Sequence, residues 1–343
     1  MNLEKTLGKE YGDITANKIA DVNYTNTSKK IIQFYDDFIA ENDFLKESSV
    51  GYNYSKSILL DSQIEYTQED ITAVSFELSR RADEKWDGCG IFLSVLIQNH
   101  YKKKKTETPY VLLQNPFEPI TERTSSFSRI GFQNNGPTIH IYGNCKNYVG
   151  EEMLSGTIVI FGNTNATCGY RLQGGTIHIE GSAGIHLGVL MEKGSIIVKE
   201  NAADFVGGKM SGGKILIEKN AERYIGKEMS GGTIHIKGDA EKYIGREMTG
   251  GEIIIDGSCK SEVGYQMKNG KIIIGKDAGN EIGHATIGGE ITIYGTARGV
   301  IGRRIRGGTI FLEDETAEVS IEQFPNSEGK IYCTGKQIFP EEK

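Results

Sequence analysis

Residues 226–244 read GKEMSGGTIHIKGDAEKYI, and variants of this 19-residue unit fill about half of the chain. Each copy contains an isoleucine followed two residues later by Ile, Val or Leu, an apolar pair written here as I-x-I, and the first isoleucine recurs ten times at a spacing of 19 without an insertion. The ten residues are Ile139, Ile158, Ile177, Ile196, Ile215, Ile234, Ile253, Ile272, Ile291 and Ile310. Two glycines keep the same spacing, from Gly150 to Gly302 and from Gly156 to Gly308. This regularity decides the fold of the region.

The repeat predicts a solenoid, in which stacked units bury together a core that one unit cannot bury alone. The I-x-I pattern alternates with a period of two, which is typical of a short strand with both isoleucines on one face. Nineteen residues are too few for a helix, a strand and two turns, and the pattern of leucine-rich repeats is absent. We therefore predict a mainly β chain, a parallel β-helix of about ten 19-residue coils.

Residues at equivalent positions of successive coils form columns along the predicted rod. The isoleucine columns and a methionine column are expected to fill the core, since methionine adapts to irregular gaps. Asn or Asp recurs in the turn after the strand, where we expect left-handed backbone geometry. This column contains Asn144, Asn163, Asn201, Asn220, Asp239 and Asp277. An outward column, Glu180, Lys199, Glu218, Lys237 and Asp256, alternates in sign and predicts weak ion pairs that help to set the register.

The glycines also divide the chain, because only five of the 44 lie in the first 130 residues. We expect residues 1–130 to form a small α/β or mainly α domain, with a helix over residues 28–46 and a capping box at Thr67 that opens a second helix. Residues 91–97 are an apolar run that suits either a helix or a strand.

The repeat and the residues after it form two further segments. We assign residues 131–314 to the β-helix and residues 315–343 to an irregular last coil and a C-terminal cap. Residues 329–335 resemble an eleventh I-x-I strand that is delayed by two residues.

Composition and charge narrow the classes of function. A net charge of −7 disfavours nucleic-acid binding, which relies on basic residues. No run of 18 apolar residues occurs, so we expect no membrane-spanning helix and no membrane among the partners. Five cysteines without a C-x-x-C pair suit reduced thiols, and Cys145 and Cys259 replace alanine in a core column. With no export signal at the N-terminus, we expect a cytoplasmic protein.

Candidate catalytic residues are few. Cys89 lies between two glycines, with Asp87 beside it and His100 eleven residues later, which suggests at most a thiol nucleophile with a base. We predict no metal site, because His140, His178 and His235 share an outward column but lie two and three coils apart, too far to share a zinc ion. No phosphate-binding or dinucleotide motif is present, so we predict no cofactor.

The outward column between the two isoleucines is the strongest candidate for an interaction site. It reads His140, Val159, His178, Ile197, Leu216, His235, Ile254, Ile273, Thr292 and Phe311. We call this column the outer stripe. Its apolar members are Val159, Ile197, Leu216, Ile254, Ile273 and Phe311. An apolar stripe on the outside of a strand indicates that another segment or another molecule packs on it. Either the N-terminal domain covers it, or a protein partner or a second copy does.

Residues 226–240, with glycine, isoleucine, Asp and methionine positions in agreement, resemble the GXGXG repeat family. This family includes a β-helical component of formylmethanofuran dehydrogenase and the C-terminal domain of the glutamate synthase large chain. The resemblance covers about residues 136–314 and implies a right-handed parallel β-helix with a structural role and no catalytic residue. An RNSGA-like segment of the synthase domain and the insertion of the dehydrogenase component are both absent.

Two classes of function remain open. The first is a non-catalytic scaffold subunit or protein-interaction module, which the resemblance would place in an oxidoreductase or amidotransferase complex. The second is an enzyme whose site lies in the N-terminal domain or at its junction with the β-helix, with Cys89, His100 and Asp87 as candidates.

Overall fold

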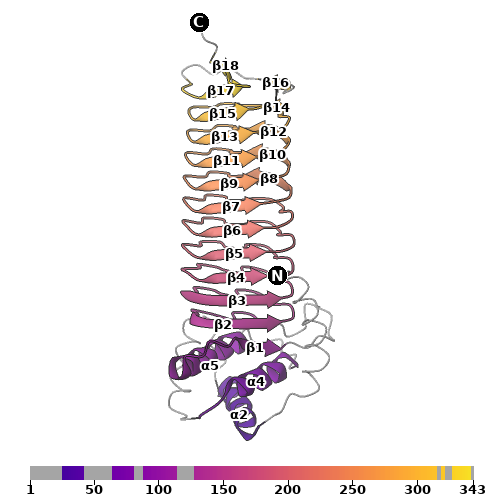
Figure 1. Cartoon of the computed structure of the whole chain (residues 1–343). Coiled ribbons are helices and arrows are strands. Elements are labelled where there is room, and N and C mark those ends of the chain that lie inside the picture. Colours follow the sequence, from indigo (N-terminus) through magenta and orange to yellow (C-terminus); the bar gives the residue numbers. More distant parts are fainter. Residues whose placement is uncertain are drawn as a thin grey trace.

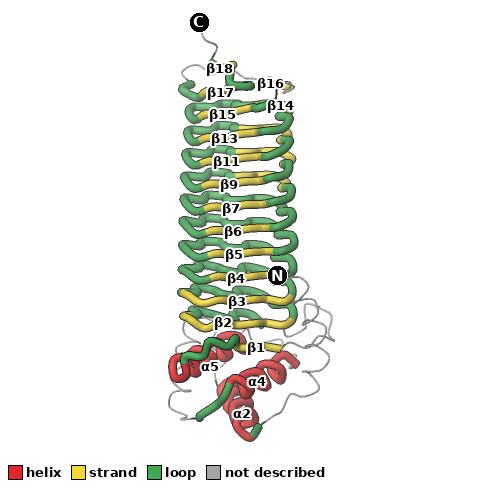
Figure 2. The backbone as a smooth tube through the Cα atoms, viewed as in Figure 1, coloured by secondary structure: helices red, strands yellow, loops and turns green. Residues whose placement is uncertain are grey.

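The computed structural model describes residues 25–41, 64–80, 88–113, 127–314, 318–320 and 327–340. Within these ranges, three helices lie at one end of a tall stack of coils (Figure 1). They are α2 (Asn26–Glu41), α4 (Gln68–Arg80) and α5 (Gly88–Lys104). Figure 2 shows that each coil is mostly turn and loop, with short strands stacked above one another.

Thirteen of the described strands form one sheet along the whole stack. In sheet order they are β1 (Tyr110–Leu113), β2 (Asn135–Tyr142), β3 (Ser155–Phe161), β4 (Thr176–Ile179), β5 (Ser195–Val198), β6 (Lys214–Ile217), β7 (Thr233–Ile236), β9 (Glu252–Ile255), β11 (Lys271–Ile274), β13 (Glu290–Ile293), β15 (Thr309–Leu312), β17 (Lys330–Cys333) and β18 (Lys336–Phe339). Two smaller sheets contain β8 (Ala240–Ile244), β10 (Cys259–Val263) and β12 (Ala278–Ile282), and β14 (Arg298–Val300) with β16 (Glu318–Ser320).

The predicted parallel β-helix is confirmed. Adjacent strands from β2 to β15 run parallel, and identical repeat positions pair, as Ile215 does with Ile234. The delayed eleventh strand is present as β17, where Ile331 pairs with Ile310 across a spacing of 21 residues.

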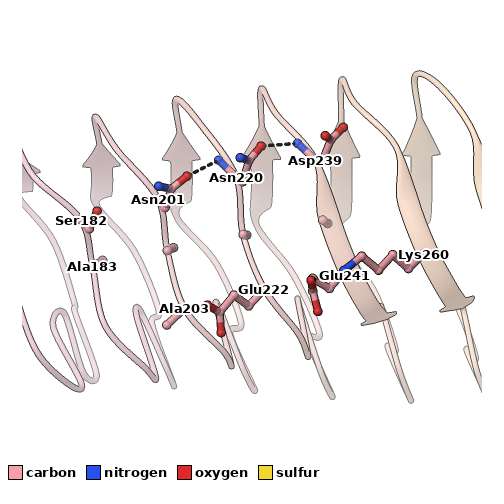
Figure 3. Close-up of a pocket in the computed structure, with 12 residues that line it drawn as sticks. Ser182, Ala183, Asn201, Ala203, Asn220, Glu222, Asp239, Glu241 and Lys260 are labelled. Atoms are coloured by element: carbon pink, nitrogen blue, oxygen red, sulfur yellow. Dashed lines mark hydrogen bonds and ion pairs between the residues drawn. The ribbon is translucent and has the colours of Figure 1, made fainter.

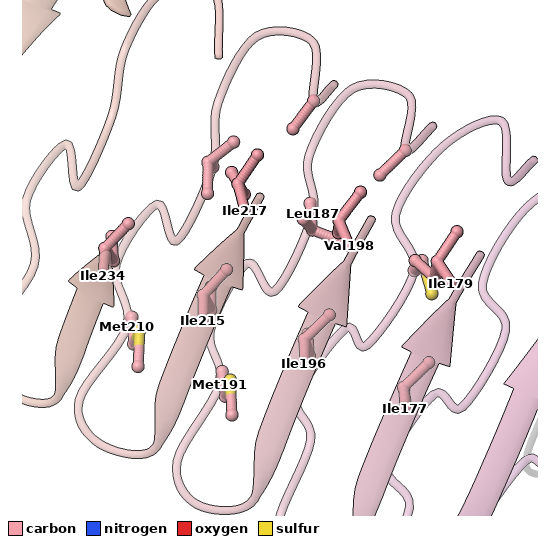
Figure 4. Packing of buried hydrophobic residues seen from close by; sticks show 14 of the residues in the cluster. Ile177, Ile179, Leu187, Met191, Ile196, Val198, Met210, Ile215, Ile217 and Ile234 are labelled. Carbon is pink, nitrogen blue, oxygen red and sulfur yellow. The ribbon is translucent and has the colours of Figure 1, made fainter. Parts of the chain in front are cut away.

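The isoleucine and methionine columns fill the interior as expected. Both members of each I-x-I pair and Met210 are shielded from solvent, and Figure 4 shows several of these side chains pointing between the strands and the turns. Each fully buried side chain of this size contributes about 1.5–3 kcal/mol relative to exposure. The core is continuous from Ile31 of α2 to Phe339 of β18.

The Asn/Asp column has a different basis from the one expected. None of its six members has a positive φ, so the prediction of left-handed geometry is wrong. Instead, each side-chain oxygen accepts a hydrogen bond from the backbone N–H one coil later, as Asn220 Oδ1 does from Asp239 N at 2.8 Å. The column is therefore a ladder of side chain to backbone hydrogen bonds between successive coils. It does not require a left-handed backbone.

The charge column forms ion pairs between coils. Glu218 Oε2 accepts from Lys237 Nζ at 2.6 Å, and its other oxygen lies 3.6 Å from Lys199 Nζ. Asp256, the next acidic residue of the column, contacts His235 Nε2 at 2.9 Å and not the neighbouring Lys237. These side chains are largely exposed, so the pairs support the register more than the stability.

The N-terminal helices confirm the two predicted ones and resolve the ambiguous apolar run as α5. The capping box at α4 uses Asp70: its backbone N–H donates to Thr67 Oγ1 at 3.2 Å, and its carboxylate accepts from Thr67 N at 3.0 Å. Thr25, which caps α2, donates to the other oxygen of Asp70. One carboxylate therefore connects the starts of two helices.

Helix α5 closes the N-terminal end of the rod. Gly131 N donates to Ser94 Oγ at 2.9 Å, and Gln98 Nε2 donates to Phe132 O at 3.2 Å. In later coils the equivalent backbone groups bond to the preceding coil, as Gly150 N does to Ile130 O. Strand β1 adds in parallel to β2 and so extends the sheet by one strand below the first coil.

At the other end, β18 runs antiparallel to β17, and Phe339 is buried against the last coil. Because β18 turns back on the sheet, the next position of the parallel stack is already occupied. The described solenoid therefore ends in elements that are not coils of the repeat, with α5 at one end and the antiparallel strand β18 at the other.

The glycine that comes directly before each strand, such as Gly232, has no room for a side chain. Its replacement by alanine should therefore cost much more stability than the replacement of a glycine that has free space around it. Gly232 has φ +87°, and an added Cβ would lie 2.7 Å from Gly213 O and 2.5 Å from Met210 Cε. We expect Gly232→Ala to lower the free energy of unfolding by about 2–4 kcal/mol, measured by urea denaturation followed by circular dichroism. Gly208→Ala is the control, because its Cβ would meet no atom closer than 3.6 Å, and a loss of equal size there would contradict this explanation.

Candidate interaction surface

The outward face of the large sheet consists of three parallel columns, because side chains of a strand alternate between the two faces. The strand-start column contains Thr138, Thr157, Thr176, Ser195, Lys214, Thr233, Glu252, Lys271, Glu290 and Thr309. The outer stripe comes next. The strand-end column contains Tyr142, Phe161, Glu180, Lys199, Glu218, Lys237, Asp256, Gly275, Tyr294 and Glu313.

The outer stripe is apolar along most of the rod and only partly buried by its neighbours. Its predicted aliphatic members, such as Ile197 and Leu216, are half-buried, whereas the aliphatic residues on either side of them are inaccessible to solvent. The strand-start column beside the stripe is polar throughout, and the strand-end column is charged from Glu180 to Asp256. A narrow apolar band between polar borders has the layout of the centre and rim of a protein interface.

Aromatic residues mark both ends of this face. Near the N-terminal end Tyr142 and Phe161 stack with centroids 4.5 Å apart, and His140 packs edge-on against Phe161. At the other end Phe311 stacks on Tyr332 at 5.3 Å. Tyr294, in the strand-end column, is 57% exposed although it is a large aromatic residue.

The histidines of the stripe differ in their surroundings. Burial lowers the pKa of His178 below 6.5, because its ring lies among aliphatic neighbours such as Val159 and Ile197 on the adjacent strands. His235 instead directs Nε2 at the carboxylate of Asp256. At neutral pH the ring of His178 therefore adds to the apolar surface.

The described helices leave this face open. Figure 1 shows α2, α4 and α5 gathered beyond β1 at the end of the rod, rather than along the sheet. Within the described residues, the N-terminal domain caps the solenoid instead of folding over the stripe. This observation favours a covering by another chain.

A groove of about 510 Å³ lies on another side of the rod (Figure 3). Alanines at positions 183, 202, 203, 221 and 240 leave it open, and Asn201, Asn220 and Asp239 form its rim. The side-chain oxygens of the rim bond to the backbone of the following coil, and Glu241 pairs with Lys260. These polar groups are used in contacts between coils and do not form a binding site. The groove exists because the alanine side chains that line it are small.

The structure does not bring the candidate catalytic residues together. Cys89 and His100 lie on the same helix, α5, and eleven residues of helix separate them by about 16 Å. His100 Nδ1 instead forms a hydrogen bond with Tyr110 Oη at 2.9 Å, and burial with nearby Lys104 lowers its pKa. Asp87 lies outside the described residues.

Sequence reasoning missed an aromatic column in the turns. His186, Phe205, Tyr224 and Tyr243 stack along the rod, with centroids 4.5 Å apart for the last two pairs. The ring faces contact one another, so they cannot serve as platforms for a ligand. The signal was the recurrence of aromatic residues at the same spacing of 19.

Within the described ranges, no group of three His, Cys, Asp or Glu residues is placed to hold a metal ion. A search of the same ranges found no helix long and apolar enough to cross a membrane. The predicted positions of Cys145 and Cys259 in the alanine column are confirmed, and both thiols are buried.

Comparison with known proteins agrees with the geometry of the coils. Residues 125–236 match a family described as the GXGXG motif. This part of the chain is similar to that family. No curated protein matches the chain. The coils continue beyond the matched residues with the same pairing, since Ile253, Ile272, Ile291 and Ile310 extend the column in register.

The environment of His178 gives a testable pKa. We expect an NMR titration to place it below 6.5, with the signal assigned through a His178→Gln variant. Because protonation is less favourable in the folded state, this residue should reduce stability as the pH falls through 6.5 toward the folded-state pKa. The variant should lack that part of the pH dependence, and a pKa above 6.5 would contradict the described burial.

Proposed function

We propose that this chain is a non-catalytic scaffold whose outer stripe docks a protein surface. The observation that carries the proposal is the half-buried apolar column on the large sheet, which no described helix covers. Isolated apolar residues on a surface are common, but a contiguous stripe bordered by polar columns is typical of an interaction site. The absence of a convergent catalytic cluster among the described residues agrees with this role.

The architecture supports a scaffold of fixed length. Each coil is tied to the next by backbone hydrogen bonds, and the two ends carry α5 and β18. The stripe is therefore held at a regular spacing on a stiff element, with its side chains ordered before a partner arrives. Preordered side chains lose less conformational entropy on binding, which favours affinity.

The GXGXG motif supports a more specific form of the proposal. In the resembling families the coils form a structural block beside catalytic subunits or domains, so an oxidoreductase or amidotransferase assembly is the class of complex we propose. None of the five cysteines forms a disulfide bond, and Cys145, Cys168 and Cys259 are buried. These thiols favour a reducing compartment, and we propose the cytoplasm.

A charge placed in the stripe should prevent docking. We expect Leu216→Glu to lose the proteins that co-purify stoichiometrically with the wild-type chain from its native host, because it places a carboxylate in an apolar contact. The losses are read by quantitative mass spectrometry, with circular dichroism confirming the fold. Ile185→Glu is the matched control, since Ile185 is 45% exposed in a turn away from the large sheet. Equal behaviour of the two variants would refute docking at the stripe.

The enzyme alternative gives an opposite expectation for Cys89. This residue is partly buried on α5 and packs against the core without a base from His100. We expect Cys89→Ser to change stability by less than about 1 kcal/mol and to leave every co-purifying protein in place. Loss of a measurable activity in the native host after this substitution would instead favour a catalytic thiol.

A further inference from the structure

We propose that the outer stripe binds the outer stripe of a second copy of this chain, with the two rods packed face to face and their axes antiparallel. This inference rests on the proposed function, because it names the partner of the same surface. The observation behind it is that the three outward columns complement themselves under one twofold rotation. The apolar residues and the charges agree on the same axis.

The axis runs parallel to the strands and passes between β6 and β7. Two sheets packed face to face lie about 10 Å apart. Rotation about this axis sets each column against the same column of the second copy, in reverse order of coils. Strand β6 then faces β7, β5 faces β9, and β4 faces β11. All ten coils from β2 to β15 face a coil of the second copy.

The strand-end column supplies the charge complementarity. Glu218 faces Lys237 of the second copy, and Lys199 faces Asp256 of the second copy. The alternation of sign along the rod is what makes this possible, because an axis between two coils sets each charge opposite its complement. An axis that passed through β7 itself would set Lys237 against Lys237 of the second copy, which is a pair of like charges.

The outer stripe contributes apolar contacts on the same axis. Ile197 faces Ile254, and Leu216 faces the ring of His235. His178 faces Ile273, which suits a histidine in apolar surroundings. Each of these contacts occurs twice, because the axis relates the two copies. The apolar centre therefore continues across both rods instead of ending against polar groups.

The strand-start column introduces no conflict. Lys214 faces Thr233, and Thr176 faces Lys271. Ser195 meets Glu252 and Thr157 meets Glu290, so every charged member of this column lies opposite a hydroxyl group. Rods with parallel axes would set Glu252 against Asp256 of the second copy twice as well as Lys214 against Glu218 twice, whereas the antiparallel arrangement leaves no pair of like charges directly opposite each other. Like charges placed opposite each other in an interface oppose association.

The size of the face agrees with a stable dimer. Ten coils at about 4.8 Å and a width of five residues give a face about 48 Å long and about 16 Å wide. Each copy would thus contribute about 800 Å², the area typical of a specific protein interface. The sheet is also regular over this length, because its strands pair in register from β3 to β15.

A charge swap tests both the dimer and its direction. Lys199 and Asp256 are 46% and 49% exposed, and within one chain they lie three coils apart, so they do not contact each other. We expect sedimentation equilibrium to show a dimer of the wild-type chain. Lys199→Glu and Asp256→Lys should each weaken it at least about tenfold, because each places two pairs of like charges across the interface.

The double variant Lys199→Glu with Asp256→Lys should bring the dissociation constant back to within about threefold of the wild type. In one chain this swap sets a carboxylate at position 199 between Glu180 and Glu218, so a rescue reports on the contact between copies alone. Ile185→Glu should leave the dimer unchanged. A wild-type chain that stays monomeric up to about 100 µM, or a double variant no tighter than the single ones, would overturn the proposal.

The failure of the dimer and the failure of the scaffold give different results. If the wild-type chain is monomeric and Leu216→Glu still loses host proteins that Ile185→Glu retains, the stripe docks another protein and only the dimer is refuted. If Leu216→Glu changes neither the mass in solution nor the co-purifying proteins, the proposed function fails as well.

Discussion

Hydrogen bonds between equivalent backbone positions of successive coils are the interaction on which the rest of this structure depends. They hold every coil at an offset of 19 residues, so that isoleucine meets isoleucine in the core and asparagine meets the next turn on the surface. A slip of one residue would turn the I-x-I side chains to the opposite face. The continuous core, the side-chain ladders and the outer stripe are all consequences of that single register.

The register requires an unusual backbone. Besides the glycines, two positions of almost every coil have a positive φ with a side chain present, as Tyr224 (61°) and Glu228 (57°) do. This conformation costs roughly 1–2 kcal/mol for each such residue. The neighbouring coils stabilise it: Tyr224 N bonds to Lys242 O and Glu228 N bonds to Arg246 O, both within 3.0 Å. The turns are therefore determined by contacts between coils more than by local preference.

This origin of the turns explains how much of the molecule could be predicted from its sequence. Periodicity identified the strands, the core columns and the delayed strand β17, because these depend on which positions are apolar. It misassigned the backbone of the Asn ladder, because a recurring asparagine does not show which hydrogen bond recurs with it. It also could not foresee that Ser94 and Gln98 take the place of a missing coil, since that role depends on contacts outside the repeat. The outer stripe was predictable as a column, and so was the alternation of charge in the neighbouring strand-end column, but the sequence does not show that the described helices leave this face open (Figure 1).

Strand β1 has one more consequence. It precedes the coils in the chain and lies beneath them in the sheet, where its backbone pairs with β2. Each coil up to β15 pairs with the coil before it in the same parallel way. The stack therefore starts on a strand that lies outside the repeat, and this strand fixes the register of the first coil.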